Sequence, residues 1–484
     1  MVFNSPSFLI FFLLFFTAYW TIFKSSTNRQ NTLLLIGSYV FYGWADWRLL
    51  SYLVAASLFN YGIGEALESS KKEKTKKWLV YLAVLQGVGG LIYFKYNNFF
   101  IEGLMYLIGD FNTQLINILA PLGISFFTFK TLGYVLSINK GKIEAEKNVV
   151  VFLNYVSFFP CIMSGPIDSA KSFIPQLKRV RTFDYKNGVN ALRQILWGLF
   201  KKVAVADSIA TVTDSIFLDY SVLPGSSMLL GAFLYTVQIY ADFSGYSDMA
   251  IGFSRLLGFN TTKNFEFPFF ANNIADFWRR WHISLTSWLT EFLFTPLSIL
   301  FRDYGRIGLA LAIVINFTVI GIWHGPRWTY LCFGFAHGCY FIPLIVKGTM
   351  NKKNKMSKQK YLPGWIEARK MLGTFVFVML TFILFRAESI SIAFEYYRIL
   401  FSSSLFQMPF LLEADTGLHV LPKVFSLPVF AFLLIEWFGR DGEYAIANIG
   451  KRAGRPARRA LYYSLLVAIF WFGGKEQTFI YFQF

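Results

Sequence analysis

The chain of 484 residues alternates long apolar runs with short polar segments. A helix needs about 20 apolar residues to cross the hydrocarbon core of a bilayer. Runs of about this length, or slightly shorter, lie near residues 5–23, 31–45, 49–67, 78–96, 99–119, 121–138, 149–165, 188–218, 226–258, 307–323, 328–346, 368–386, 424–438 and 460–474. Several are too short or too broken to span. The pattern predicts an all-α polytopic membrane protein with a single integral-membrane domain over residues 1–484.

Composition and charge agree with this class. Hydrophobic residues make up 55% of the chain and charged residues only 15%, a balance that no water-soluble surface accommodates at this length. The net charge of +18 comes from Lys and Arg gathered between apolar runs, as in cytoplasmic loops. Because these clusters flank the spans and form no contiguous basic stripe, we expect membrane lipid and no nucleic acid as a partner.

The charged segments also predict an orientation. The basic segments at 24–29, 71–77, 178–181, 347–360 and 440–459 are expected on the cytoplasmic side. The more acidic segment 388–423 is expected outside. Counting crossings from the last basic loop places an aromatic C-terminal tail, residues 475–484, on the extracytoplasmic face.

Two stretches interrupt the helical pattern. Residues 158–177 contain Pro160, Gly165, Pro166 and Pro175, and residues 264–297 mix aromatic with charged side chains. Non-helical backbone at membrane depth is tolerated only where it is buried in protein or lines a cavity. Both stretches are therefore predicted to be re-entrant segments that enclose a pocket.

The three cysteines, Cys161, Cys332 and Cys339, lie in apolar surroundings without a CxxC spacing. We interpret them as small buried hydrophobes, and we expect neither a disulfide framework nor a bound metal. The first segment, FLIFFLLFFTAYW, has no basic residue before it and no cleavage site after it, so it is interpreted as a retained span and not as a signal peptide.

The chain has four histidines, and two of them stand in apolar, tryptophan-rich sequence. His324 follows Trp323 and precedes Gly325 and Pro326, where one span stops and the next begins. A Gly-Pro break leaves an imidazole accessible from a cavity, and a neutral imidazole is suited to removing a proton from a hydroxyl. His324 is predicted to be a catalytic general base; the alternative is a buried histidine that bonds a neighbouring helix.

His282 lies in the sequence DFWRRWHISLTSWL. If this piece is helical, Arg279 and His282 share a face that could meet the phosphate or carrier of a donor. We assign His282 an assisting catalytic role and take Arg279, Arg280 and Trp281 as donor-binding candidates. The alternative is an interfacial segment whose arginines bind lipid head groups and whose tryptophans mark the membrane boundary.

Other polar residues in apolar context are candidates to line a tunnel. Asp242 or Asp248 could hydrogen-bond an imidazole and fix its tautomer, and Asn316 lies eight residues before His324 on the same helix. Trp323 belongs to the same group. His337 could position His324 or only pack helices, and His419 receives no role.

These motifs together resemble the membrane-bound O-acyltransferase family. The pieces FWRRWHISLTSWL and IGIWHG, with their histidines forty-two residues apart, are accompanied by YADFSGYSDMAIG, PLGISFFTFKTLGYVLSI and FFPCIMSGPID. From MVFNSPSFLIFF through GSYVFYGWADW to FIYFQF, the chain is most similar to the bacterial alginate-O-acetylase branch, and SGPID is similar to the relative that transfers D-alanine to teichoic acid. The piece TPLSILFRDYGRIG departs from the Gly-Gly-Asn-Arg of the alginate branch.

The resemblance implies a ring of about eleven transmembrane helices around a central tunnel in a bacterial cytoplasmic membrane. It implies His324 at the neck of the tunnel and His282 on the cytoplasmic approach. The expected reaction moves a short acyl group, most simply acetyl, from acetyl-CoA or an acyl-carrier protein to hydroxyls of an extracytoplasmic polymer or exopolysaccharide. No bound cofactor is expected, and a secreted or membrane-anchored acetyltransferase or esterase-like partner would complete the transfer.

The tail adds one hypothesis. Tyr481 offers a phenolic hydroxyl near the end of the chain and could accept the acyl group before handing it on. The alternative is an aromatic plug or interfacial anchor. Competing functions for the whole chain are D-alanyl transfer, a transporter or flippase with broken helices, and a scaffold in an export complex.

Overall fold

The structure is a computed structural model that describes residues 1–101, 119–350, 352, 362–413, 417–419, 426–448, 454–473 and 477–480. Tyr481 and most of the basic segment 347–360 lie outside the described residues. The contacts divide the chain into two compact units, residues 1–192 with 250–263 and residues 193–249 with 264–484. The single integral-membrane domain over residues 1–484 stays a prediction.

The described part of the chain is helical, as predicted, apart from one short hairpin. Its strands β1 (Leu411–Glu413) and β2 (Gly417–His419) pair antiparallel. The helices of the first unit are α1 (Pro6–Thr21), α2 (Thr27–Gly43), α3 (Arg48–Ser69), α4 (Glu73–Leu91), η1 (Ile92–Tyr96), α6 (Ile124–Asn139), α7 (Val149–Ser157) and α8 (Ala170–Lys178), and α9 (Tyr185–Leu199) begins there.

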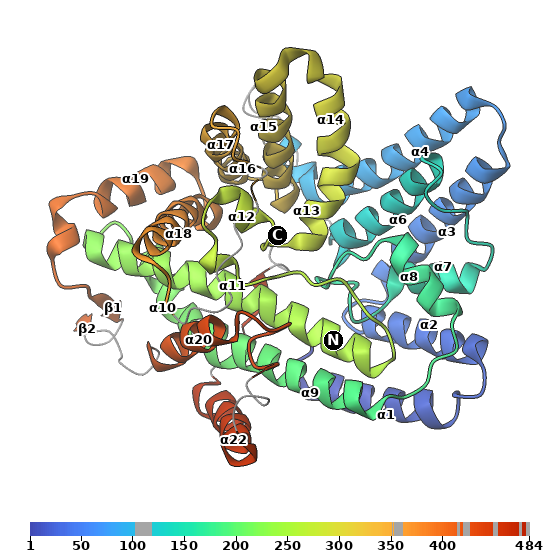
Figure 1. The fold of residues 1–484 in the computed structure, drawn as a ribbon, viewed down its shortest axis with the longest axis horizontal. Coiled ribbons are helices and arrows are strands. Elements are labelled where there is room, and N and C mark those ends of the chain that lie inside the picture. Colours follow the sequence, from blue (N-terminus) through green and yellow to red (C-terminus); the bar gives the residue numbers. More distant parts are fainter. Residues whose placement is uncertain are drawn as a thin grey trace. The chain divides into compact units, whose positions relative to one another are not determined.

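The second unit holds the long helix α11 together with many short or broken helices (Figure 1). They are η2 (Phe200–Ala206), α10 (Asp207–Leu218), α11 (Gly225–Leu256, whose end belongs to the first unit), η3 (Pro268–Phe270), α12 (Ile274–Trp278), α13 (Ile283–Leu289), η4 (Thr290–Phe294), α14 (Thr295–Leu300), η5 (Arg302–Tyr304), α15 (Gly305–His324), α16 (Trp328–Tyr340), α17 (Ile342–Val346), α18 (Trp365–Arg386), α19 (Ile390–Leu400), η6 (Ser403–Phe406), α20 (Ser426–Gly439) and α22 (Arg455–Phe472).

Five helical stretches among the described residues are long and apolar enough to cross a membrane: Glu73–Ile101, Ile283–Leu300, Arg302–His324, Trp328–Val346 and Trp365–Arg386. Pro6–Thr21 and Leu427–Gly439 are shorter apolar helices. Helix α1 leaves Leu9, Ile10, Leu13 and Leu14 exposed, and an exposed apolar face of this kind suits contact with lipid. The chain is a polytopic membrane protein; the number of eleven spans, the ring and the tunnel stay predictions.

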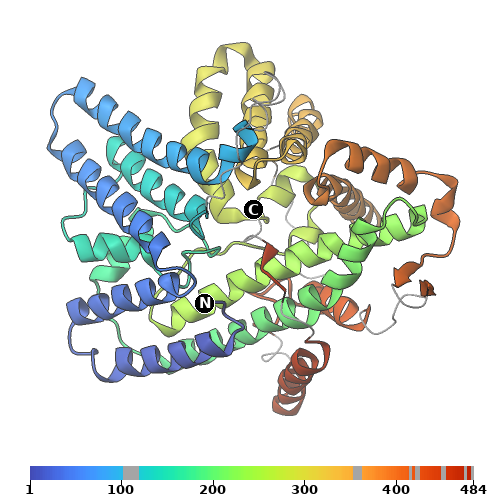
Figure 2. The ribbon, with the colours of Figure 1, turned by 180° about the vertical axis from the view of Figure 1, so that it is seen from behind.

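In the first unit, α3, α4 and α6 lie side by side, as the view from behind shows (Figure 2). A Cβ at Gly64 on α3 would lie 2.6 Å from the Tyr134 ring, so glycine lets α6 approach closely. Elsewhere in this unit, a cluster of phenylalanines packs α1 onto α2 and the end of α11. The ring centroids of Phe12 and Phe253 lie 4.7 Å apart. Burial of these rings holds the unit together.

In the second unit, α15 and α16 form a close antiparallel pair (Figure 1). A Cβ at Gly321 would lie 2.1 Å from the main-chain oxygen of Tyr330, and one at Gly334 would lie 2.2 Å from that of Phe317. The two backbones therefore approach at a distance that only glycine permits. The last residue of α15 is His324, directly before Gly325 and Pro326.

The two stretches predicted to interrupt the helices do so. Helix α7 ends at Ser157, and buried turns lead from Phe158 to α8. In the second stretch, the main chain is left-handed at Phe267 and again at His282, with φ of 50° and 44°. The condition under which Arg279 and His282 would share a helix face is therefore not met, because the main chain is left-handed at His282 and α13 begins only after it. The re-entrant position of both stretches stays a prediction.

Candidate active site

His324 ends α15 and is enclosed by aromatic rings. Its imidazole is 5% exposed, and its ring centroid lies 4.8 Å from that of Phe385 on α18 in an edge contact. Phe333 and Tyr330 on α16 lie farther away, at 6.2 and 6.4 Å. Gly325 follows in extended conformation, and a Cβ there would lie 2.8 Å from the Tyr330 ring. Three helices thus hold this imidazole in an apolar pocket.

His282 is buried at the break between α12 and α13. Its Nδ1 lies 3.3 Å from the side-chain oxygen of Asn264, which also accepts hydrogen bonds from the main-chain N–H and the hydroxyl of Ser284. The main-chain oxygen of Asn264 accepts from the N–H of Ile283 at 2.9 Å. Because Asn264 presents an oxygen, Nδ1 of His282 donates, and the lone pair of the neutral ring is on Nε2.

Burial favours the neutral form of His282. Its side chain precedes the span Ile283–Leu300, and desolvation lowers the pKa of the imidazole to about 3. Near neutral pH the ring is therefore uncharged. A neutral ring with a fixed tautomer can accept or relay a proton through Nε2.

Trp323 connects the two histidines. Its ring centroid lies 5.8 Å from that of His282 and 4.9 Å from that of His324. His282 also meets Phe243 of α11 in an edge contact at 4.8 Å. Two histidines forty-two residues apart in sequence thus flank one indole ring.

A polar pocket lies against the ring that contacts His324. Its volume is about 250 Å³, and Phe385 forms part of its wall. The other lining residues come from α10, α11, the loop after α15, the end of α18 with the loop that follows it, and the C-terminal segment: Ala210, Asp214, Tyr235, Gln238, Arg327, Arg386, Glu388, Gln477, Thr478 and Ile480. Arg386 forms an ion pair with Asp214 at 2.8 Å.

Several lining groups, among them Gln238 and Arg327, have no polar partner among the described residues. The side-chain oxygen of Gln238, in a residue only 8% exposed, accepts no hydrogen bond from them. Arg327 forms no ion pair with them and lies over the Tyr330 ring. A buried carbonyl without a donor favours a ligand that carries a hydroxyl, and the pocket offers it charges of both signs, from Arg327 and Arg386 and from Asp214 and Glu388.

The predicted carboxylate partners of the imidazoles have other partners. Asp242 binds Lys202 at 2.8 Å, and Asp248 binds Lys201. The expectation that one of them fixes a histidine tautomer is therefore wrong, since Asn264 does this for His282. Sequence reasoning missed Asn264 because an amide eighteen residues from the histidine gives no distinct signal.

His337 has a packing role. Its Nδ1 accepts from the indole N–H of Trp278 at 3.2 Å, and its Nε2 lies 2.9 Å from the hydroxyl of Thr381. Both ring nitrogens are thus used to join α12, α16 and α18. Of the two roles proposed for His337, the structure favours helix packing.

Most of the remaining candidate residues lie near the break between α12 and α13. Arg280 binds Asp276 at 3.1 Å, and Arg279 donates to the main-chain oxygen of Met350 at 3.3 Å. Trp281 is buried in a cluster of rings that includes Phe277 and Phe382. Asn316 is buried two turns before His324, and its side-chain oxygen accepts no hydrogen bond from a described residue. The arrangement therefore brings His282, His324 and Trp323 together and leaves Asn316 apart from them.

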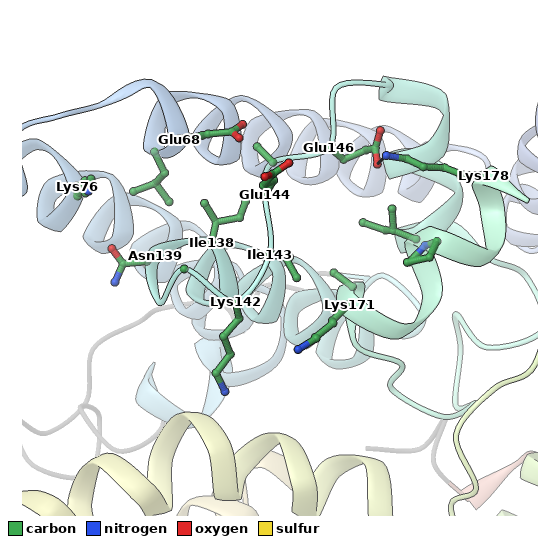
Figure 3. A pocket seen from close by; sticks show the side chains of 16 residues that line it. Glu68, Lys76, Ile138, Asn139, Lys142, Ile143, Glu144, Glu146, Lys171 and Lys178 are labelled. Atoms are coloured by element: carbon green, nitrogen blue, oxygen red, sulfur yellow. Dashed lines mark ion pairs between the residues drawn. The ribbon is translucent and has the colours of Figure 1, made fainter.

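A larger groove in the first unit, of about 730 Å³, has a different character. Lys178 pairs with Glu146 at 2.7 Å on its rim, and further glutamates and lysines line it (Figure 3). None of the predicted site residues lines this groove. Within the described residues, no three His, Cys, Asp or Glu side chains gather to hold a metal ion.

Fold and site define a helical integral-membrane protein with two buried histidines that contact one indole ring, and with a polar pocket behind the Phe385 ring that contacts one of them. Comparison with known proteins identifies the family to which a protein of this class belongs. The sequence model of the membrane-bound O-acyltransferase family matches residues 143–386. The chain is 34% identical to the probable alginate O-acetylase AlgI of Pseudomonas aeruginosa, over 91% of this chain and 81% of that protein.

Two other relatives carry different activities in their names. The peptidoglycan O-acetyltransferase of Helicobacter pylori is 29% identical, over 82% of this chain and 79% of its own length. The teichoic acid D-alanyltransferase of Streptococcus thermophilus is 29% identical, over 70% of this chain and 81% of its own length. The chain belongs to the membrane-bound O-acyltransferase family, and it is an acyltransferase.

Proposed function

We propose that this protein is an O-acetyltransferase of a bacterial cytoplasmic membrane that transfers acetyl to hydroxyls of an extracytoplasmic cell-envelope polymer. The acetylase named for P. aeruginosa supports acetyl as the group, and the H. pylori relative supports a cell-envelope target. Acetyl-CoA or an acyl-carrier protein would supply the group from the cytoplasm.

His324 is the proposed general base. Its imidazole takes the proton of the acceptor hydroxyl while the hydroxyl oxygen attacks the acetyl carbonyl; the new ester bond forms and the donor's thiol or alcohol leaves with a proton. His282 assists through Nε2 from the other side of Trp323. The observation that carries this proposal is the placement of His324, buried and in contact with Phe385 on the wall of the polar pocket.

The pocket is the proposed entry of the acceptor. The unpartnered oxygen of Gln238 suits a hydroxyl donor, and Arg327 suits a carboxylate or phosphate on the same molecule. A secreted or membrane-anchored acetyltransferase-like partner would carry the group onward. Tyr481 stays a candidate intermediate acceptor, supported by its neighbour Ile480, which lines the pocket.

The test compares two buried histidines. His324→Ala is expected to lower acetate incorporation into cell-envelope polysaccharide by about 10²–10⁴-fold while the protein stays folded, because a general base contributes this much. His337→Ala, the matched control, is expected to lower thermal stability and leave most activity per folded molecule. Full activity of folded His324→Ala would refute the proposal.

D-alanyl transfer is the second candidate, favoured by the S. thermophilus relative. The same cells distinguish the two, because acetate and D-alanine are both released from the envelope by mild alkali and are separable by chromatography. Loss of D-alanine with unchanged acetate in His324→Ala cells would replace acetyl by D-alanyl.

A further inference from the structure

A buried ion cluster joins η2, α10 and α11 of the second unit. The ammonium of Lys202 lies 2.8 Å from a carboxylate oxygen of Asp207 and 2.8 Å from one of Asp242. All three side chains are at most 5% exposed. Buried charges are costly unless their remaining lone pairs and protons find partners, so the other contacts of this cluster indicate what it is for.

Those contacts go to the C-terminal segment 477–480. Lys202 donates to the main-chain oxygen of Gln477 at 3.1 Å, and Asp242 accepts from the main-chain N–H of Ile480 at 2.8 Å. The ammonium also lies over the Phe479 ring, 5.8 Å from its centroid. One cation and one anion thus bind the two ends of a four-residue segment through its backbone.

The same segment forms part of the pocket beside His324. Gln477, Thr478 and Ile480 line it together with Phe385. Phe479 points elsewhere and packs on Tyr246 at 4.8 Å and Phe243 at 6.3 Å, and Phe243 contacts His282. The segment is therefore in contact with the ion cluster, the pocket and the surroundings of His282.

We propose that Lys202 and Asp242 are positioning residues for acyl transfer: they hold residues 477–480 in place as a wall of the pocket beside His324. This inference rests on the proposed function. Without the cluster, the segment loses two charge-assisted hydrogen bonds and leaves the pocket open to water.

The neighbouring residue provides a matched control. Lys201 is also a buried lysine of η2 that binds a carboxylate of α11, Asp248, and it donates to the hydroxyl of Ser244 at 2.9 Å. Among the described residues, no hydrogen bond or ion pair joins it to the C-terminal segment. Lys201→Gln therefore removes a comparable buried charge without releasing the segment.

The first experiment measures the position of the segment directly. In full-length protein with the three native cysteines replaced by alanine, Ile480→Cys is labelled with a maleimide in detergent; Ile480 is only 7% exposed, so labelling is slow. Lys202→Gln is expected to speed labelling at least tenfold and to lower envelope acetate at least tenfold. Lys201→Gln is expected to change each less than threefold.

A second pair of variants avoids any change to the charges. Ile480→Pro lacks the N–H that Asp242 accepts, whereas Ile480→Ala keeps it and only shortens the side chain. The proline variant is expected to retain at most a tenth of the acetate incorporation of the alanine variant. This pair decides the matter if Lys202→Gln does not fold.

Unchanged labelling in Lys202→Gln, an equal rise in Lys201→Gln, or equal activities of the two Ile480 variants would overturn the proposal. Faster labelling with full activity would overturn it too, because the segment would then be bound but irrelevant to transfer. The labelling result does not depend on catalysis, so failure of the His324 assignment is distinguishable from failure of this inference.

Discussion

The indole of Trp323 meets the imidazole of His282 at 63°, with 5.8 Å between their ring centroids. The adjacent residue on α15 is His324, so this contact links the surroundings of the two histidines. The packing of Trp323 therefore bears on both the stability and the chemistry of the site.

Truncation of the Trp323 side chain is expected to lower both stability and acyl transfer strongly. Trp323→Ala removes a large buried ring and should cost about 3–5 kcal/mol of stability, with loss of acyl transfer. Trp323→Phe keeps an aromatic ring between the histidines and should retain most of both. Melting of the detergent-purified variants and alkali-released acetate from cells measure the two effects. Equal activity of the two variants would show that the ring has no role in placing the histidines.

Substitution of Asn264 is expected to lower both stability and activity, although nothing in the sequence marks this residue. Asn264→Ala leaves the Nδ1–H of His282 and the N–H of Ser284 without their acceptor, and each such loss costs about 1–3 kcal/mol. Because the tautomer is then no longer fixed, activity per folded molecule should fall as well. Asn264→Asp, which still offers an oxygen, should restore part of the activity; no difference between the variants would argue against a tautomer role.

The low pKa of His282 gives a pH dependence of stability. The imidazole titrates near 6.5 when unfolded and at about 3 when folded, so the unfolded state binds the extra proton between these values. Its contribution to stability is present above about pH 6.5 and is lost as pH falls toward 3. His282→Gln should therefore show a flatter decline of melting temperature over this window. An identical decline would contradict the assignment.

The glycines between α15 and α16 predict a steric effect. Gly334→Ala places a methyl group 2.2 Å from a backbone oxygen, and such overpacking costs about 1–3 kcal/mol. Gly373→Ala on α18 is the control, since a Cβ there meets nothing within 4 Å. Its melting temperature should stay equal or rise slightly, whereas that of Gly334→Ala should fall.

Arg327 is expected to affect the acceptor and not the fold. Arg327→Gln should lower envelope acetate about tenfold or more with little change in melting temperature, because a charge-assisted hydrogen bond to a ligand is worth about 1.5–3 kcal/mol. Arg302, which is exposed and, within the described part of the chain, pairs only with its neighbour Asp303, is the control. A fall of melting temperature equal to that of activity would show a structural role for Arg327 instead.

The sequence predicted the helices well wherever apolar runs were long and uninterrupted, as for α11, α15 and α18. It also placed the end of α15 at His324, because Gly325 and Pro326 cannot continue a helix. It did not predict the left-handed backbone at His282, since a non-glycine residue at positive φ is held there by tertiary contacts such as the bond from Ile283 to Asn264.

The partners of the buried carboxylates were beyond sequence reasoning for a related reason. Asp242 could pair with any cation or imidazole brought near it, and only the fold shows that Lys202 and Ile480 are the neighbours. These contacts join residues forty and more than two hundred positions apart. The local sequence pattern shows that a buried charged side chain needs a partner, but it does not show which residue is that partner.

The way in which Lys202 and Asp242 bind the C-terminal segment 477–480 has a consequence for how acceptor specificity can differ between members of the family. Lys202 and Asp242 bind main-chain atoms of residues 477 and 480, so the docking tolerates replacement of the side chains there. Those side chains line the pocket, and substitutions among them would reshape it for a new acceptor without detaching the segment. Homologous enzymes that modify different polymers could thus evolve their specificity in the last residues of the chain.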